Sequence, residues 1–173
     1  MYLISVYFDE KTNRRMQRYI DLVAEKTGNH FMIEGQVPPH MAISAFEMQR
    51  EEGALEALER IANRLEPGIL TFASAGQFFP YVMFLQPVLN EYLHNLSEIV
   101  FEELKWVEAI KISPFYQPFQ WIPHVTIGKT LPKEEMQMAF EVLQNHFGVF
   151  EGTVVRIGLA KTNPHREIKG FAL

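Results

Sequence analysis

The chain has 173 residues, 47% hydrophobic and 21% charged, which is typical of a folded globular protein and carries no signature of disorder. Its formal net charge of −5 argues against a protein that coats long nucleic acid, because an acidic surface repels a phosphate backbone, although a local pocket for a small anion stays compatible with it. The absence of cysteine excludes disulfides, cysteine-ligated zinc and cysteine nucleophiles. The absence of cysteine fits the cytoplasmic protein that we expect, and no apolar stretch approaches the ~20 residues that span a bilayer.

The first half of the chain predicts alternating strands and helices. Residues 2–8 are β-branched and aromatic, which predicts a first strand rather than a signal peptide. Residues 10–27 place apolar side chains at the spacing of one helix face, and Gly28 predicts the end of that helix. The remaining elements of this half are a strand at 40–46, a helix through 55–65, and two strands at 69–79 and 81–86 joined at Pro80.

The second half repeats this order. It predicts a helix at 89–100, an aromatic and proline-rich loop at 113–123, a strand from His124, a helix at 136–147, a strand at 152–162 and a short last strand at 169–173. Helices that alternate with strands are compatible with a parallel α/β sheet. The neighbouring strand pairs at 69–86 and 150–173 favour a mostly antiparallel sheet, and therefore an α+β fold.

Two short stretches share one design. VPPHMAISA at 37–45 and IPHVTIGKT at 122–130 each place proline before histidine and isoleucine three residues after it, and the two histidines are 84 residues apart, close to half the chain length. Side chains alternate between the faces of a strand, so His124 and Thr126 are predicted to share one face, as are His40, Ala42 and Ser44. If an approximate two-fold axis relates the halves, both histidines flank one small space.

Two imidazoles beside a hydroxyl suit phosphodiester chemistry without a metal. An unperturbed histidine has a pKa near 6.5, so one ring can accept a proton from the attacking hydroxyl while the other donates one to the leaving oxygen. A hydroxyl can hold the phosphoryl oxygens as charge builds. The alternative is that both histidines are structural. The other histidines lack such a partner and are expected to be solvated surface or loop residues: His30, His94, His146 and His165.

PHMAI and PHVTI resemble the paired H-x-[ST]-x motifs of the 2H phosphoesterase superfamily, which includes 2′-5′ RNA ligase-like proteins and 2′,3′-cyclic phosphodiesterases. The resemblance implies two pseudo-symmetric α+β lobes, each a mostly antiparallel sheet with helices on its outer face, and His motifs that face a central cleft. For this chain it implies one domain, 1–173, with lobes of approximately 1–86 and 87–173 between which strands can exchange. It assigns His40 and His124 to catalysis and Thr126 to substrate binding.

Further substrate-binding candidates lie beside the motifs. Ala42 stands where the resemblance expects Ser or Thr, and Ser44 follows on the same predicted face. Lys129 falls where RNA ligase-like members often carry a basic residue, and a bulge at Gly128 would turn it toward the site. Trp121 is positioned to stack on a nucleobase or to be a core or rim aromatic, as are its neighbours Phe119 and Tyr116.

The resemblance and the motif chemistry together predict a metal-independent phosphoesterase that uses no cofactor. It would act on 2′-5′ or 2′,3′-cyclic phosphates of RNA ends, oligonucleotides or nucleotides, or catalyse the reverse ligation. The expected partner is a small nucleotide or RNA end carrying a phosphate, without an extended nucleic-acid groove or a membrane. One alternative is a weakly active or inactive module that binds a phosphate or an RNA end, because Ala42 removes the first motif hydroxyl. Another, a histidine-ligated metal site, has too few ligands in the two motifs.

Overall fold

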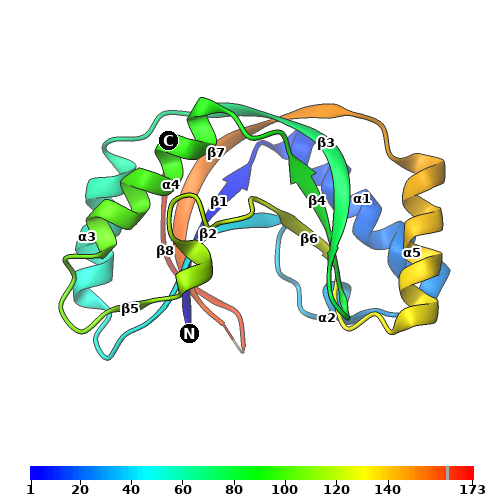
Figure 1. The fold of residues 1–173 in the computed structure, drawn as a ribbon, viewed down its shortest axis with the longest axis horizontal. Coiled ribbons are helices and arrows are strands. Elements are labelled where there is room, and N and C mark those ends of the chain that lie inside the picture. The colour runs from blue at the N-terminus through cyan, green and yellow to red at the C-terminus, as the bar shows by residue number, and fades with distance from the viewer. Residues whose placement is uncertain (163) are drawn as a thin grey trace.

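The computed structural model describes residues 1–162 and 164–173, and it contains one eight-stranded sheet with helices packed against it (Figure 1). Every pair of neighbouring strands is antiparallel, which confirms the predicted α+β class and the antiparallel sheet. The strands are β1 (Tyr2–Phe8), β2 (His40–Glu47), β3 (Gly68–Phe78), β4 (Val82–Pro87), β5 (Lys111–Ile112), β6 (Val125–Gly128), β7 (Phe150–Lys161) and β8 (Arg166–Ala172). The helices are α1 (Glu10–Thr27), α2 (Phe31–Glu34), α3 (Glu52–Ala62), α4 (Glu91–Leu104) and α5 (Lys133–His146).

The long strand β7 organises the sheet. The strand order is β5-β2-β1-β7-β3-β4-β6, and β8 also pairs with β7. β7 pairs with β1 along one edge, while its other edge pairs first with β3 and then with β8. It forms the long arch across the upper part of Figure 1. β7 therefore connects β5, β2 and β1 on one side of the sheet with β3, β4 and β6 on the other.

Two helix pairs pack against different ends of this sheet. α1 and α5 pack together and α1 contacts β6, whereas α3 and α4 pack together and α4 contacts β2; the pairs lie on the right and left of Figure 1. α1 forms where the apolar period predicted it, with Met16, Tyr19, Ile20 and Val23 buried. It ends at Gly28, which has a φ of 74°.

The strands that carry the two histidine motifs lie side by side. β2 is next to one end of the strand order and β6 is at the other end, yet the two strands contact each other. A flat sheet would hold these strands far apart, so the sheet bends until its ends meet. This curvature positions the candidate site.

A few elements differ from the sequence predictions. The short helix α2 has no buried residue, and so no apolar period marked it in the sequence. The two-residue strand β5 lies in the segment before the aromatic loop and pairs with the end of β2. Leu89 is 67% exposed ahead of α4, whose buried face begins at Leu93.

None of the helices in residues 1–162 and 164–173 has the length and apolarity needed to cross a membrane.

Candidate active site

The two histidines of the predicted pair have the same local geometry. His40 is the first residue of β2, and its Nδ1 lies 2.9 Å from the carbonyl oxygen of Pro38. His124 immediately precedes β6, and its Nδ1 lies 2.8 Å from the carbonyl oxygen of Ile122. A carbonyl oxygen can only accept, so each Nδ1 carries the hydrogen and each Nε2 is left to accept or donate a proton. The intervening proline favours an extended conformation of the residue whose carbonyl orients the ring.

Trp121 ties the two motifs together. Its indole nitrogen donates a hydrogen bond of 3.1 Å to the carbonyl oxygen of Ala42. This bond joins the loop that ends at His124 to the strand that begins at His40. The strands on or beside which the two histidines lie, β2 and β6, contact each other, although the histidines are 84 residues apart in the chain. Sequence left Trp121 as either a substrate contact or a core or rim aromatic, and its hydrogen bond to the first motif strand is a structural contact.

Aromatic rings surround His124. Its ring centroid lies 4.8 Å from that of Phe78 and 5.4 Å from that of Phe84, both in edge-on contact. Phe84 pairs with Thr126 across the ladder and its ring also contacts His124, so Thr126 and His124 share a face as alternation predicts. The other side chains of β6 are buried in the core, whereas Thr126 is only partly buried. The second motif therefore presents an imidazole and a hydroxyl side by side.

Polar and charged side chains surround His40. Tyr7 pairs with His40 across the β1–β2 ladder, with ring centroids 6.1 Å apart, and the ring of His165 stacks at 6.0 Å and 29°. The guanidinium of Arg156 lies 4.6 Å from the Tyr7 ring centroid and forms an ion pair with Glu167. His165 lies in a turn just before β8 and is partly exposed, as expected of a loop residue, but its ring stacks on that of His40. Sequence gives no signal for this contact, because the two histidines lie far apart in the chain.

Ser44 lies on the opposite face from the one predicted. Along the β1–β2 ladder Ala42 pairs with Ser5, but Ser44 pairs with Ile4, a fully buried core residue, because the register slips between them. A bulge resets the alternation of side chains, so Ser44 does not share the face of His40 and is only 1% exposed. Ala42 keeps the face of His40, but it is 7% exposed and its side chain has little access to a ligand.

Lys129 lies near the pair through a second bulge. The β4–β6 ladder pairs Phe84 with Thr126 and Met83 with Gly128, so one residue of β6 is extra. The bulge lies beside Gly128, where one was expected, and because β6 has an extra residue, strict alternation no longer assigns Lys129 to the outward face. The ammonium of Lys129 lies 5.6 Å from the Phe31 ring centroid, and its charge acts on His40.

Burial lowers the pKa of both motif histidines below the ordinary value of 6.5. For His40 the charges of His165, His124 and Lys129 lower the pKa further. Burial also lowers the pKa of His165, against the opposing effect of Glu167. Near neutral pH each of these rings is therefore mainly uncharged in the free protein, with Nε2 able to accept a proton.

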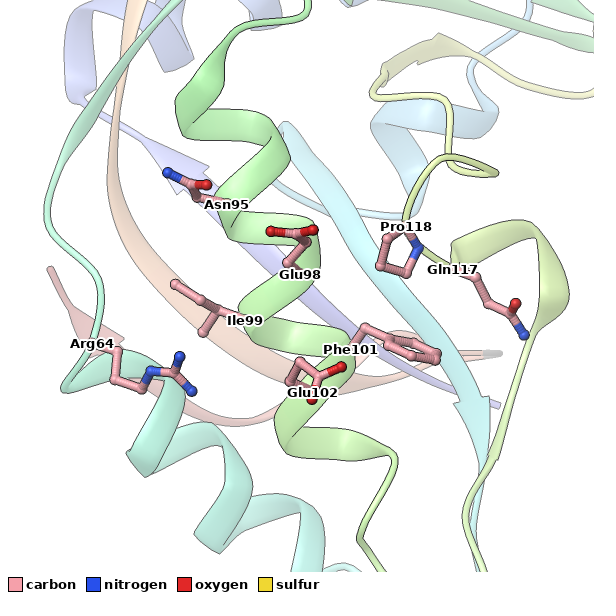
Figure 2. A pocket seen from close by; sticks show the side chains of 8 residues that line it. All are labelled: Arg64, Asn95, Glu98, Ile99, Phe101, Glu102, Gln117 and Pro118. Atoms are coloured by element: carbon pink, nitrogen blue, oxygen red, sulfur yellow. The ribbon is translucent and has the colours of Figure 1, made fainter.

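The aromatic loop borders a different concavity (Figure 2). This groove has a volume of about 670 Å³ and lies between α4 and the loop, where Phe101 points toward Pro118 and Gln117. Glu98 and Glu102 give its α4 side an acidic character, and neither motif histidine lines it.

Within the described residues, no group of three or more His, Cys, Asp or Glu side chains is arranged to hold a metal ion.

Comparison with known proteins places this chain in one family. A family model described as the 2′-5′ RNA ligase superfamily matches residues 21–166, which include both histidine motifs. A Geobacillus kaustophilus (strain HTA426) protein named "Putative phosphoesterase GK0864" is 26% identical over 151 residues, which cover 84% of this chain and 81% of that protein.

Solved structures share the fold over nearly the whole chain. Escherichia coli LigT in its apo form is 16% identical with a TM-score of 0.58, covering 99% of this chain and 96% of LigT. LigT bound to 3′-AMP gives 15% identity, a TM-score of 0.60 and coverage of 99% and 97%. The TT0787 protein of Thermus thermophilus is 17% identical with a TM-score of 0.57, again covering 99% and 97%. At these identities the likeness establishes the fold, and together with the family match across both histidine motifs it shows that the chain belongs to the 2′-5′ RNA ligase superfamily of LigT-like 2H phosphoesterases.

Proposed function

We propose that this protein is a metal-independent phosphoesterase that acts on 2′-5′ or 2′,3′-cyclic phosphates of RNA ends, oligonucleotides or nucleotides, or that joins such ends by the reverse reaction. The observation that carries the proposal is the matched pair of His40 and His124. Each ring is hydrogen-bonded through Nδ1 to a backbone carbonyl, and the strands that begin at or just after them, β2 and β6, contact each other. The nucleotide ligands of LigT, among them 3′-AMP and ATP, support a nucleotide-sized substrate.

In the proposed hydrolysis each ring takes part in one proton transfer. The uncharged histidine takes a proton from water as the water oxygen attacks phosphorus. The protonated histidine gives its proton to the ribose oxygen as the P–O bond breaks, which leaves a phosphomonoester and a free hydroxyl. The pair begins and ends with one proton, on opposite rings, and each transfer typically contributes about 10²–10⁴-fold in rate. The Thr126 hydroxyl and the Lys129 ammonium would stabilise the phosphoryl oxygens as charge builds.

The proposal places this reaction in a cleft between two lobes. One lobe would contain β1, β2, β5 and β8 with α3 and α4, and the other β3, β4 and β6 with α1 and α5. Packing supports lobes that exchange elements between the sequence halves, because α1 packs on β6 and α4 packs on β2. Neither half of the chain would then form its own lobe alone, and the site would require the whole chain to fold.

A specific observation favours a second candidate function, binding without efficient turnover. The first motif offers no hydroxyl beside His40, because position 42 is alanine and Ser44 is buried on the core face. A transition state that needs phosphate ligands from both motifs would then be stabilised by Thr126 alone. In that case the protein would bind a phosphate or an RNA end and hydrolyse it poorly.

An EDTA-treated assay separates these functions from each other and from metal-dependent hydrolysis. Purified protein is tested against 2′,3′-cyclic nucleotides, 2′-5′ dinucleotides and ADP-ribose cyclic phosphate, together with His40→Ala, His124→Ala and the double variant. We expect each single variant to lose about as much activity as the double variant, because both rings act in one transition state. His94→Ala, which removes a partly exposed ring from α4, serves as the control. Binding without turnover would favour the second candidate, and near wild-type activity in either single variant would rule out the paired mechanism.

A further inference from the structure

A concavity of about 500 Å³ lies between α1 and α5, and the described residues that line it have basic or aromatic side chains. Its lining residues are Arg14, Arg15, Arg18, Tyr19 and His146. Among the residues that the structure describes, no carboxylate lines it, although the chain has 21 Asp and Glu residues and a net charge of −5. Its volume is within the usual range for small-molecule sites, roughly 300–1,000 Å³. A local concentration of positive charge in an acidic chain points to an anionic ligand.

Arg15 is held in place by contacts that leave most of its donors available. Its Nε donates to the Tyr19 hydroxyl and one Nη donates to the Gly148 carbonyl, both over 3.3 Å. Its guanidinium also lies 4.4 Å from the Phe150 ring centroid. These neutral contacts fix the side chain without cancelling its charge. Of the five N–H groups that a guanidinium carries, three stay available to a ligand.

The carboxylates on the same helix do not neutralise the other arginines fully. Arg14 forms an ion pair with Glu10 at 2.6 Å, in which both side chains are largely exposed. Asp21, three residues after Arg18, accepts a hydrogen bond from Gln17 instead. Neither Arg15 nor Arg18 forms an ion pair with a carboxylate in the part of the chain that the structure describes.

We propose that this concavity binds the phosphate group of a small molecule, with Arg15 and Arg18 as its main ligands and Arg14 and His146 at its edge. Arginine suits this role because its planar fork donates two parallel hydrogen bonds to phosphate oxygens. The site is distinct from the histidine pair. It lies at the first half of α1 and the last residue of α5, whereas the last part of α1 leads to Asn29, which bonds to Thr130 just beyond β6.

Titration followed by NMR of the arginine Nε–Hε groups tests the proposal directly. Inorganic phosphate, pyrophosphate and AMP are added at constant ionic strength, with sodium chloride as the comparison. We expect saturable shifts of the Arg15 and Arg18 signals with all three phosphate compounds and none with chloride. Tighter binding of pyrophosphate than of AMP would assign the site to a polyphosphate group, and equal binding to a single phosphate. The absence of saturable shifts at these two residues would overturn the proposal.

Charge-matched variants separate a built site from a general positive field. Losing one charge-assisted hydrogen-bonding partner should weaken phosphate binding about tenfold or more, so Arg18→Ala and Arg15→Lys are expected to bind that much less tightly. Lys11→Ala removes one positive charge from the exposed face of the same helix, outside the concavity, and should bind nearly as well as wild type. An equal loss in Lys11→Ala would mean that only the overall field attracts the anion. Should Arg15→Lys fail to fold, Arg18→Ala, which alters a side chain exposed to solvent, carries the same test.

A last variant tests whether the NMR shifts of Arg15 and Arg18 arise from binding in this concavity. Phosphate can also bind at the proposed catalytic pair, so the titration is repeated with the His40→Ala and His124→Ala double variant. The Arg15 and Arg18 shifts should persist with the same midpoint, because neither histidine lines the concavity. Loss of the shifts in this variant would mean that they report binding elsewhere, and would overturn the proposal whatever the enzyme assay shows.

Discussion

Replacing Trp121 with phenylalanine tests whether one hydrogen bond holds the two motifs in register. Trp121→Phe keeps an aromatic ring but removes the indole N–H that donates to the Ala42 carbonyl over 3.1 Å. Losing this partly buried bond should lower the free energy of unfolding by about 1–2 kcal/mol. For a chain of this length that corresponds to a Tm lower by roughly 2–8 °C, which is measurable by circular dichroism or calorimetry.

The effect on activity should exceed the effect on folding. The loop that ends at His124 would lose its tie to the strand of His40, and a displacement of about 1 Å at a reacting group can cost on the order of 10²-fold in rate. The chain offers a matched control, because its only other tryptophan, Trp106, is 80% exposed. Trp106→Phe should change neither Tm nor kcat. Equal behaviour of the two variants would refute the argument that Trp121 positions the pair.

Three further outcomes are expected. The pKa values of His40 and His124 both lie below 6.5 in the free protein, so the pair carries a single proton mainly below that pH. The pH profile of kcat/KM should therefore peak below 6.5, and a maximum above it would contradict the assignment of these two rings as acid and base. Thr126→Val keeps the shape of the side chain but removes its hydroxyl, and kcat should fall on the order of 10²–10³-fold, whereas Thr126→Ser should retain most activity. Asp9 caps α1 and also accepts from the Thr153 amide, and these hydrogen bonds outweigh burial and hold its pKa at about 2. Asp9→Ala should therefore cost about 1–2 kcal/mol in urea unfolding at neutral pH, and a loss that shrinks as the pH falls below 3.8 would confirm that the charged carboxylate is responsible.

The features that sequence predicted are those set by local period and local chemistry. The face of α1 follows from the spacing of its apolar residues, and the pairing of His124 with Thr126 follows from strand alternation. Both histidines lie after prolines, so the geometry at each Nδ1 is local as well. Such features depend on a few neighbouring residues, and a sequence shows those directly.

The features that sequence did not predict depend on register and curvature. Ser44 turns to the core because the β1–β2 ladder slips by one residue, and nothing in the alternation of residues 40–46 marks the slip. His165, just before β8, meets His40 at the start of β2 because β8 pairs with β7, β7 with β1 and β1 with β2. The bond from Trp121 to Ala42 requires the two ends of the sheet to meet. Each of these contacts is set by the whole sheet, and so no short stretch of sequence reports it.

The two motifs combine one backbone geometry with two different environments. Each histidine donates from Nδ1 to a carbonyl, so both rings present Nε2 in the same way. His124 sits against Phe78 and Phe84, whereas His40 lies beside Tyr7, His165 and the charge of Lys129. A reaction that needs one proton donor and one acceptor requires such a difference, because two rings in identical surroundings would have no fixed division of roles. In the proposed reaction the shared geometry aligns the two rings, and their unequal neighbours determine which ring holds the proton when substrate arrives.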